Sequence, residues 1–463
     1  MASTVRSRFA QLLAATAIGT YALVILGATT AITDASQACT TWPACNGQWL
    51  ALGSPALAIV WTHRATAAVV GLLVVVVTAL AWLRSERRRV RWALALVAVL
   101  YPAQVGLGAV TATTGAPAAV SATHLVLGLS IFMGLVVALA WSLETDADDA
   151  DEPVHDPTPA PEPVDDAPAT LDPSAVGLRT KLAAYYRLTK PRLMWLLALV
   201  AAAGMALAAG PALSPRTVVL TLTGGVLAIG ASGTFNNVLE RDVDRRMQRT
   251  ADRPVVTHVV PVRNAIAFGV LLSVTAVATF LQVNLLAAAL GFTAIVYYSL
   301  VYTLLLKPNT VQNTVIGGFA GSLPALIGWA AVTESVGLPG LALAGVIFLW
   351  TPAHFYNLAL AYKDDYARGG FPMLPVVRGE AVTRKHILLY LGATLVGATL
   401  LGTVSTLDWL YAATSVALGA VFLWAVLVLH RERTERAAMR SFHASNAYLG
   451  FLLVAIVVDA LVV

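Results

Sequence analysis

Three side chains with oxygen donors follow one another at intervals of four residues, at the end of a long apolar segment: Asn236, Glu240 and Asp244. Residues four apart lie on one face of a helix, so these oxygens would form a single ridge. Such oxygens are the ligands that Mg2+ prefers, and Mg2+ commonly shares its coordination with substrate phosphates. The ridge therefore predicts a metal site for a phosphate or diphosphate. The alternative is a basic loop at the membrane surface whose arginines pair with these acids.

A second acidic pair, Asp364 and Asp365, ends another apolar segment about 120 residues further on. His354 precedes Asp365 by about three helical turns, so we expect both on one helix face. We predict that His354 belongs to the catalytic site. Two acidic ridges on one membrane face would together bind Mg2+ and a diphosphate. The predicted metal ligands and catalytic oxygens are Asn236, Glu240, Asp244, Asp364 and Asp365.

Basic side chains near both ridges are expected to bind the phosphate oxygens. Guanidinium groups bind such oxygens through two parallel N–H groups, and ammonium groups act as point charges. The expected set is Arg249, Arg253, Lys307 and Lys363, together with Lys190 and Arg192. For Lys190 and Arg192, an ordinary role as anchors at the membrane surface is the alternative.

The composition identifies the kind of protein that must position these residues. Hydrophobic residues make up 58% of the chain and charged residues only 12%, with a mean hydropathy of +0.75. A soluble domain has about a quarter charged residues, so we predict an all-α polytopic membrane protein. Thirteen apolar runs approach the roughly 20 residues that cross a bilayer as a helix. These runs are 8–32, 54–83, 92–112, 118–142, 193–210, 217–236, 262–280, 284–306, 311–332, 338–360, 385–403, 409–429 and 443–463.

The distribution of basic residues predicts the orientation of the spans. If the N-terminus is cytoplasmic, all of the 30 lysines and arginines except Arg64 and Arg216 fall on the cytoplasmic side. This bias is the usual one for membrane proteins. We therefore expect a multi-pass protein of the cell membrane, with the acidic motifs in the cytoplasm and the C-terminus outside.

Acidic residues divide the spans into two groups. Residues 144–172 contain eleven of the 25 acidic side chains, interleaved with proline and without one lysine or arginine. This composition predicts a disordered linker that connects the domains without fixing their geometry. The expected organisation is a four-span domain at 1–143, a linker at 144–177 and a nine-span domain at 178–463. The net charge of +5 averages over these regions and gives no indication of nucleic-acid binding.

The first four spans contain their own candidate site. His63 and His124 lie at matching depths in the second and fourth spans, so their imidazoles could bind one haem iron from two sides. A hydrogen-bonded structural pair is the alternative. Cys39 and Cys45, the two cysteines of the chain, share the first outer loop. They form either a disulfide, which an oxidising exterior permits, or two free thiols.

Residues 8–142 resemble one half of a haem A synthase. The matching strings are Thr62-His63-Arg64, Leu107-Gly108-Ala109, Ala122-Thr123-His124-Leu125 and Cys39 through Cys45. Val60 departs from the pattern, because that family carries a glutamate three residues before the first histidine, and the block is half of the usual size. The resemblance implies a haem-binding or assembly role rather than haem hydroxylation.

From Thr189 onward the chain resembles the intramembrane prenyltransferases, which are nine-helix bundles with two acidic motifs. Two strings resemble the protohaem IX farnesyltransferase (haem O synthase) branch: Trp350-Thr351-Pro352-Ala353-His354-Phe355, and Tyr362 through Tyr366 with Gly370-Phe371-Pro372-Met373-Leu374-Pro375. Other matches are Leu188 through Arg192, Asn236 through Asp244, Met247 through Thr250, Arg253-Pro254, Asn313 through Gly318 and Leu326 through Trp329. Glu240 stands where many members have Asp.

This resemblance implies transfer of a farnesyl group from farnesyl diphosphate to the 2-vinyl group of protohaem IX (haem B), giving haem O. It implies Mg2+ as cofactor and the lipid bilayer, farnesyl diphosphate and haem as partners. Haem A synthase or oxidase assembly factors are further candidate partners. The alternatives are a related enzyme acting on a quinone precursor or a glycerol lipid, and a haem carrier without catalytic activity.

Overall fold

The computed structural model describes residues 2–33, 35–144 and 177–462, with the side chains in these ranges except those of residues 2–7 and 32. In this part of the chain, thirteen helices are long and apolar enough to cross a membrane. The predicted all-α, multi-pass architecture is therefore confirmed. Residues 145–176, most of the predicted linker, lie outside the described residues.

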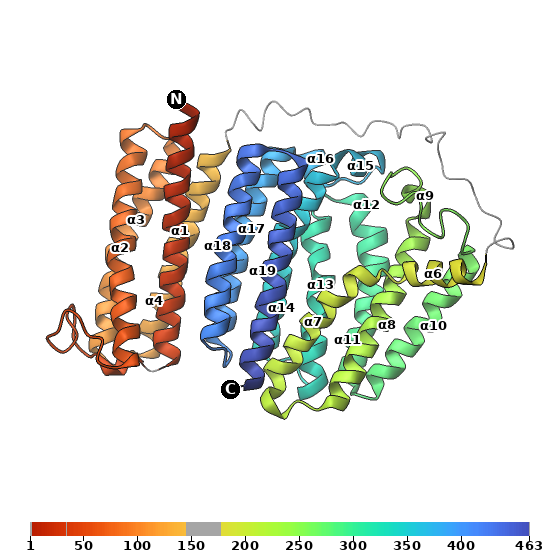
Figure 1. Ribbon diagram of the computed structural model, residues 1–463, viewed down its shortest axis with the longest axis horizontal. Coiled ribbons are helices and arrows are strands. Elements are labelled where there is room, and N and C mark those ends of the chain that lie inside the picture. The colour runs from red at the N-terminus through yellow and green to blue at the C-terminus, as the bar shows by residue number, and fades with distance from the viewer. Residues whose placement is uncertain (1, 34, 145–176, 463) are drawn as a thin grey trace.

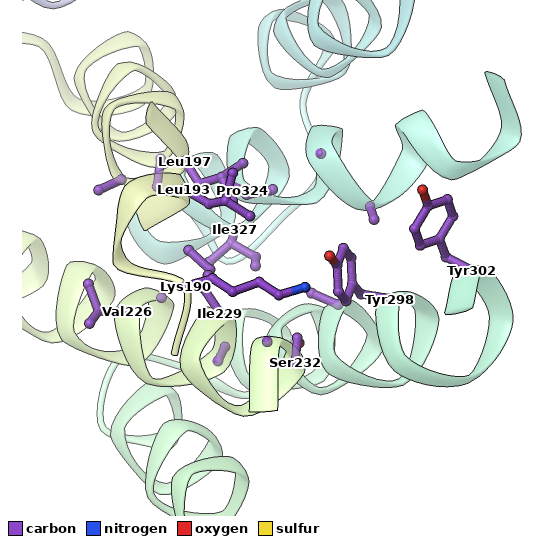
Figure 2. A pocket seen from close by; sticks show the side chains of 18 of the residues that line it. Lys190, Leu193, Leu197, Val226, Ile229, Ser232, Tyr298, Tyr302, Pro324 and Ile327 are labelled. Atoms are coloured by element: carbon purple, nitrogen blue, oxygen red, sulfur yellow. The ribbon is translucent and has the colours of Figure 1, made fainter. Parts of the chain in front are cut away.

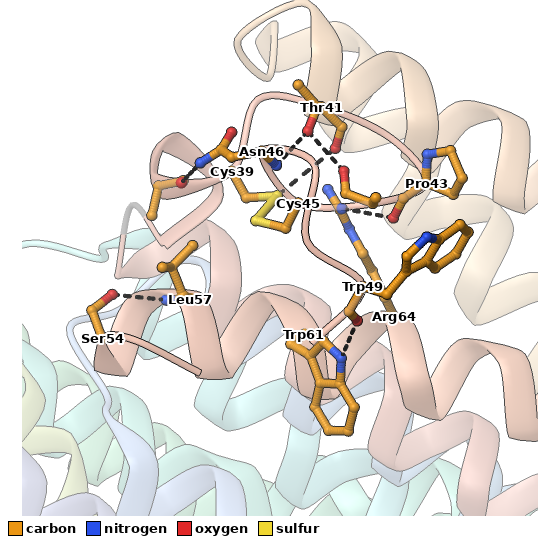
Figure 3. Close-up of a disulfide and its surroundings, with 12 residues drawn as sticks. Cys39, Thr41, Pro43, Cys45, Asn46, Trp49, Ser54, Leu57, Trp61 and Arg64 are labelled. Carbon is orange, nitrogen blue, oxygen red and sulfur yellow. Dashed lines mark hydrogen bonds between the residues drawn. A yellow bond between two sulfur atoms is a disulfide. The ribbon is translucent and has the colours of Figure 1, made fainter. Parts of the chain in front are cut away.

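The first four spans form a bundle at one side of the molecule (Figure 1). They are α1 (Ala2–Ile32), α2 (Pro55–Leu83), α3 (Arg88–Thr113) and α4 (Ala118–Leu143). The loop between α1 and α2 contains the short helix η1 (Ala35–Ala38) and a disulfide between Cys39 and Cys45 (Figure 3). Arg64 on α2 donates to the carbonyl of Pro43 over 3.1 Å, which ties this loop to the bundle.

The remaining spans form a larger bundle. After the short helix α6 (Leu178–Leu188), which lies across the ends of the spans in Figure 1, the chain crosses nine times. The spanning elements are α7 (Pro191–Ala209) with η2 (Gly210–Ala212), α8 (Pro215–Leu239), α10 (Val262–Leu281), α11 (Leu285–Val296) with η3 (Tyr297–Leu306) and α12 (Lys307–Asn309), α13 (Asn313–Thr333), α14 (Leu338–Ala361), α17 (Glu380–Thr403), α18 (Trp409–Glu432) and α19 (Glu435–Val462).

Three short helices lie at one end of this bundle: α9 (Arg241–Asp244), α15 (Lys363–Arg368) and α16 (Leu374–Val377). We call this end the acidic end, because Glu240, Asp244 and Asp365 lie there. The start of α1 is at the same end of the molecule, whereas the disulfide loop and the end of α19 are at the other (Figure 1). An odd number of spans requires this arrangement of the two termini.

The two bundles pack directly against each other. Helices α1 and α4 contact α17 and α18, and one continuous buried cluster contains side chains from both bundles. Near the middle of this interface, Tyr21 forms a buried hydrogen bond of 2.6 Å with Ser415. This interface therefore sets the arrangement of the two bundles, whereas the prediction about the linker concerns residues that lie largely outside the described ranges. The apolar faces of α1 and α4 are covered by α17 and α18 of the larger bundle.

Glu144 also departs from its expected place in the linker. Its side chain is fully buried directly after α4, where it binds Arg384 of the larger bundle over 2.6 Å. Arg433, at the junction of α18 and α19, binds the other oxygen of the same carboxylate over 3.2 Å. Arg87 donates to the backbone carbonyl of Glu144 over 2.7 Å. Local composition predicted a solvated acid here, but two arginines distant in the sequence compensate the buried charge.

Candidate active site

The first acidic ridge is present in the structure, although the helix that carries it changes direction. Helix α8 ends at Leu239 and α9 begins at Arg241, yet the i to i+4 backbone bonds continue through this junction. The N–H of Glu240 donates to Asn236 over 3.0 Å, and that of Asp244 donates to Glu240 over 2.8 Å. The three side chains are 2%, 4% and 0% exposed. They therefore face the interior and not the solvent around the loop.

Three basic side chains surround this ridge. Lys307 binds Glu240 Oε1 over 2.5 Å, and Arg253 binds Asp244 Oδ2 over 2.5 Å. The ammonium group of Lys190 donates to Asn236 Oδ1. These cations come from three separate segments, the ends of α6 and η3 and the loop after α9. These three segments therefore meet at the ridge, at the acidic end of the bundle.

A turn with a strained backbone places Lys190 beside the ridge. Its backbone is left-handed (φ 54°, ψ 56°), a conformation that costs a non-glycine residue energy and is found where the surroundings enforce it. The turn lies directly on α8: a Cβ atom on Gly233 would be 3.0 Å from the carbonyl oxygen of Leu188 and 3.2 Å from Lys190 Cγ. Asn237 also donates to the Leu188 carbonyl over 3.5 Å. Glycine on α8 therefore allows the approach that brings Lys190 into the site.

The pKa values of the ionisable groups in this cluster are shifted from their ordinary values. Burial and the charge of Arg253 lower the pKa of Lys190 to about 7. Burial opposes ionisation of Glu240, but the charges of Lys307 and Lys190 hold its pKa below the usual value. Burial raises the pKa of Asp244 despite the opposing charge of Arg253. Three basic groups face two acids, so the cluster favours the binding of a further anion.

Helix η3 contributes one wall of this site, which was not predicted from the sequence. This segment is a π-helix of 10 residues, a rare geometry that is often found at functional sites. Thr303 Oγ1 accepts from Asn236 Nδ2 over 3.1 Å and donates to the carbonyl of Tyr298 over 2.9 Å. The run of Tyr, Ser and Thr residues within an otherwise apolar span is the signal that would have indicated it.

An apolar cavity of about 260 Å3 opens beside Lys190 (Figure 2). Helices α7, α8 and α13 supply its aliphatic wall, and Figure 2 shows the Lys190 side chain reaching toward Tyr298 and Tyr302. Its lining includes Leu193, Leu197, Val226, Ile229, Gly317, Gly321, Pro324, Ile327, Thr351 and Phe355. A cavity that is apolar along its length and charged at one end suits a ligand with a hydrocarbon chain and an anionic head.

The second acidic motif is arranged differently from the prediction. Helix α14 ends at Ala361, and Tyr362 has non-helical angles (φ −120°, ψ 31°), so α15 does not continue the face of α14. Asp365 is buried and accepts from the backbone N–H of Gln248 over 2.8 Å. It also binds Arg368 over 2.8 Å. Asp365 therefore joins α15 to the loop that follows the first ridge, whereas Asp364 is exposed.

His354 does not share a face with Asp365 because of this break. Its ring is stacked between Trp350 and Phe442, at centroid distances of 4.2 Å and 4.4 Å. Its Nδ1 lies 2.7 Å from Ser445 Oγ on α19. The contacts that orient the imidazole therefore come from the α14–α19 interface.

The other predicted basic residues occupy distinct positions. Arg249 lies over the rings of Tyr362 and Tyr366, at 5.2 Å and 5.4 Å. Lys363 binds Glu380 over 3.2 Å. Arg192 is exposed on the first turn of α7 and is not among the side chains that line the apolar cavity. Of the neighbouring pair Lys190 and Arg192, the structure thus brings only Lys190 to the ridge.

A second, polar cavity of about 680 Å3 lies at the acidic end, and its lining includes Asp365 and the residues Gln248 and Arg249, whose N–H groups bind it. Its walls come from α15, the loop after α9, the start of α17 and the junction of α18 with α19. The charged lining residues are Arg249, Lys363, Asp364, Asp365, Arg368, Glu380, Arg384, Arg433 and Glu435.

The five predicted metal ligands are not assembled into one group. Within the described residues, no three His, Cys, Asp or Glu side chains are close enough to bind one metal ion. Glu240 and Asp244 are paired with Lys307 and Arg253 instead. Asp244 Oδ1 is nevertheless buried and has no hydrogen-bond partner in the described part of the chain. A buried carboxylate oxygen without a partner is uncommon, and it fits a site that a cation completes.

In the first bundle, both candidate histidines lie against glycines of a neighbouring helix. A Cβ atom on Gly27 would be 3.1 Å from His63 Cε1, and one on Gly108 would be 3.1 Å from His124 Cε1. The Nδ1 atoms of both rings are buried and have no hydrogen-bond partner among the described residues. The rings are thus packed closely, and Nδ1 of each has no partner among the described residues.

Comparison with known proteins agrees with this arrangement. Residues 196–452 match the UbiA prenyltransferase family, and residues 10–161 match a family described as cytochrome oxidase assembly protein (COX15-CtaA). Among solved structures, a study of digeranylgeranylglyceryl phosphate synthase describes a similar fold. It has a TM-score of 0.52 and 15% identity, and the match covers 61% of this chain and 100% of that one.

Closer relatives match along the whole chain, including both bundles. Protoheme IX farnesyltransferase of Haloarcula marismortui is 63% identical over 458 residues, which are 98% of each chain. Protoheme IX farnesyltransferase of Halobacterium salinarum (strain R1) is 60% identical over 100% of each chain. This chain therefore belongs to the protohaem IX farnesyltransferase family, within the UbiA prenyltransferases, and is a prenyl-transferring membrane enzyme.

Proposed function

We propose that this protein transfers the farnesyl group of farnesyl diphosphate to the 2-vinyl group of protohaem IX, giving haem O and diphosphate. The observation that carries the proposal is the apolar cavity that ends at Lys190, beside the ridge of Asn236, Glu240 and Asp244. The cavity suits a prenyl chain, and the charged cluster suits a diphosphate. A protein that only carried haem would need neither feature.

Mg2+ is the proposed cofactor. Asn236, Glu240 and Asp244 would hold it, and Asp364 and Asp365 are the remaining predicted ligands. The free Oδ1 of Asp244 supports this role. When bound, Mg2+ would neutralise the diphosphate and make it a better leaving group. Lys307 and Arg253 would then exchange their contacts with Glu240 and Asp244 for contacts with the phosphate oxygens.

The residues around the cavity would guide the substrate through the reaction. Lys190, Arg249 and Lys363 would bind the departing diphosphate, with the charge of Lys190 closest to the cavity. Cleavage of the C1–O bond leaves an allylic cation, which Tyr298 and Tyr302 would stabilise through their ring faces. The vinyl group of the haem attacks C1, and water captures the resulting cation beside the porphyrin and releases a proton. His354 would orient the acceptor through the α14–α19 interface.

Two further proposals concern the membrane and the first bundle. The distribution of basic residues supports a cytoplasmic acidic end and an outer disulfide loop. The unpartnered ring nitrogens of His63 and His124 support a haem bound between α2 and α4. In this arrangement, the first bundle would bind haem at the outer half of the membrane.

The test is incubation of purified protein in lipid nanodiscs with haem B, farnesyl diphosphate and Mg2+, with pigments identified by mass. Formation of haem O, and its loss when EDTA removes Mg2+, is the expected result. Parallel incubations contain a quinone precursor or a glycerol phosphate lipid in place of haem. Prenylation of either of these, without haem O, would overturn the proposed acceptor but not the prenyl transfer.

A further inference from the structure

Helix α8 contains four glycines, and three of them are packed closely against other parts of the chain. A Cβ atom on Gly224 would lie 2.9 Å from the ring of Phe280, and one on Gly230 would meet a neighbouring side chain at 3.3 Å. On Gly233 it would lie 3.0 Å from the carbonyl oxygen of Leu188. Glycine lowers the stability of a helix relative to alanine, and close packing accounts for its presence at these three positions.

Gly225 is the exception among the four. A Cβ atom there would meet nothing within 4 Å outside its own stretch of helix, yet the residue is only partly exposed and lines the apolar cavity. Packing therefore does not account for a glycine at this position. Open space beside a helix, within a cavity of the size and polarity of a ligand site, is space that a ligand can fill.

The depth of Gly225 in the cavity follows from the geometry of α8. Ser232 and Val226 lie along this helix at increasing distance from Tyr298 (Figure 2). Gly225 is seven residues from Ser232, which corresponds to about 10.5 Å along the axis. An extended chain advances about 1.2 Å per bond, since three backbone bonds span about 3.3–3.6 Å. Two isoprene units of four bonds each therefore extend from the level of Ser232 to that of Gly225.

The cavity ends a short distance beyond Gly225. Thr221, about 6 Å further along α8, is buried and is the last residue of this helix in the lining. On the facing wall, the lining of α7 ends at Ala201, where α7 meets α13: a Cβ atom on Gly204 would lie 2.5 Å from the carbonyl oxygen of Ala325. Two backbones in such close contact leave no room for a chain between them. The space between Gly225 and this crossing corresponds to one more isoprene unit.

We infer that Gly225 determines the length of the prenyl chain that this enzyme uses, because the third isoprene unit of the farnesyl group lies beside it. This inference rests on the proposed function, which places the diphosphate at the ridge and the prenyl chain in the apolar cavity. A larger side chain at position 225 would exclude the third unit and leave room for the first two. Gly225 is far from the reacting atoms, so its role is in specificity and not in the chemical step.

The test measures binding of the S-thiolo analogues of geranyl and farnesyl diphosphate, which have two and three isoprene units, to the purified full-length protein with Mg2+. All variants are placed in nanodiscs of one lipid composition, so that partition of the analogues into lipid is the same for each. The wild type is expected to bind the farnesyl analogue about tenfold or more tightly, because the third unit is buried in an apolar site. Gly225→Leu is expected to lower this preference by about tenfold or more, through weaker binding of the farnesyl analogue alone.

Gly345→Leu is the matched control. Gly345 is also a glycine within a spanning helix, α14, with open space around it, but it does not line the apolar cavity. Its preference should equal that of the wild type. If Gly225→Leu does not fold, Gly225→Ala decides the matter, because alanine favours the helix and its methyl group should lower the preference by about threefold or more.

The inference is overturned if folded Gly225→Leu keeps the preference of the wild type, or if it weakens both analogues equally while Gly345→Leu weakens neither. An unchanged preference in Gly225→Ala, where only that variant folds, would overturn it as well. The proposed function is tested separately by turnover with haem B. A wild type that shows the expected preference but forms no haem O would contradict the proposed acceptor and support the role of Gly225.

Discussion

The two acidic motifs of this protein have similar compositions but different structural roles. The first lies on a helix whose backbone bonds continue through a change of direction, and its three side chains are buried, each beside a basic residue. The second follows a break at Tyr362, and its two acids lie next to each other on α15, where Asp364 is exposed and Asp365 is buried. Asp365 accepts backbone N–H groups from the loop that follows the first motif. The first motif therefore contains the charged groups of the site, and the second connects the segments that position them.

The largest effect is expected at the centre of the first motif. Asp244→Asn removes the charge that faces Arg253 and replaces one carboxylate oxygen by an NH2 group, and should lower the rate of haem O formation by roughly 10^2- to 10^3-fold. Asp242→Asn is the control, because Asp242 is exposed and contacts only Arg241 among the ion pairs described. Its rate should remain within about twofold of the wild type, since isolated surface pairs contribute little. Equal losses in both variants would contradict the distinction between inward and outward acids.

In the second motif, we expect Asp364 to contribute to the reaction and Asp365 to the stability of the fold. Asp365→Asn should lower the free energy of unfolding by about 1–3 kcal/mol, since the backbone N–H groups of Gln248 and Arg249 and the side chain of Arg368 lose a charged acceptor. Asp364→Asn should lower the rate without a measurable change in melting temperature, because Asp364 is exposed. Thermal unfolding and haem O formation are measured on both variants. A destabilised Asp364→Asn, or an unchanged Asp365→Asn, would remove the difference between the two residues.

The smallest effect concerns two neighbouring basic residues. Lys190→Met should raise the KM for farnesyl diphosphate by about tenfold, because a point charge at the end of the apolar cavity is lost. Arg192→Met, two residues away but exposed, should leave the KM within about twofold. Steady-state kinetics at fixed haem concentration measure both. An equal increase in both variants would indicate that only the general surface charge matters.

These pairs illustrate how far the sequence determines the site. Helix count and the first ridge follow from hydrophobic runs and a four-residue spacing, which are local properties. The separation of Lys190 from Arg192 depends on a left-handed backbone pressed against Gly233, and the placement of His354 depends on the break at Tyr362. Neither feature has a local signature. The burial of Glu144 depends on arginines that composition could not connect with it.

The interface between the bundles also has a consequence for the order of assembly. Arg384 follows Glu144 by 240 residues, and Ser415 follows Tyr21 by 394 residues. At roughly 5–20 residues per second, the ribosome needs about 12–48 s to supply the first of these partners. During that interval Glu144 and Tyr21 lack the groups that neutralise or bind them. The first bundle to be synthesised is therefore among the last parts of the protein to be completed.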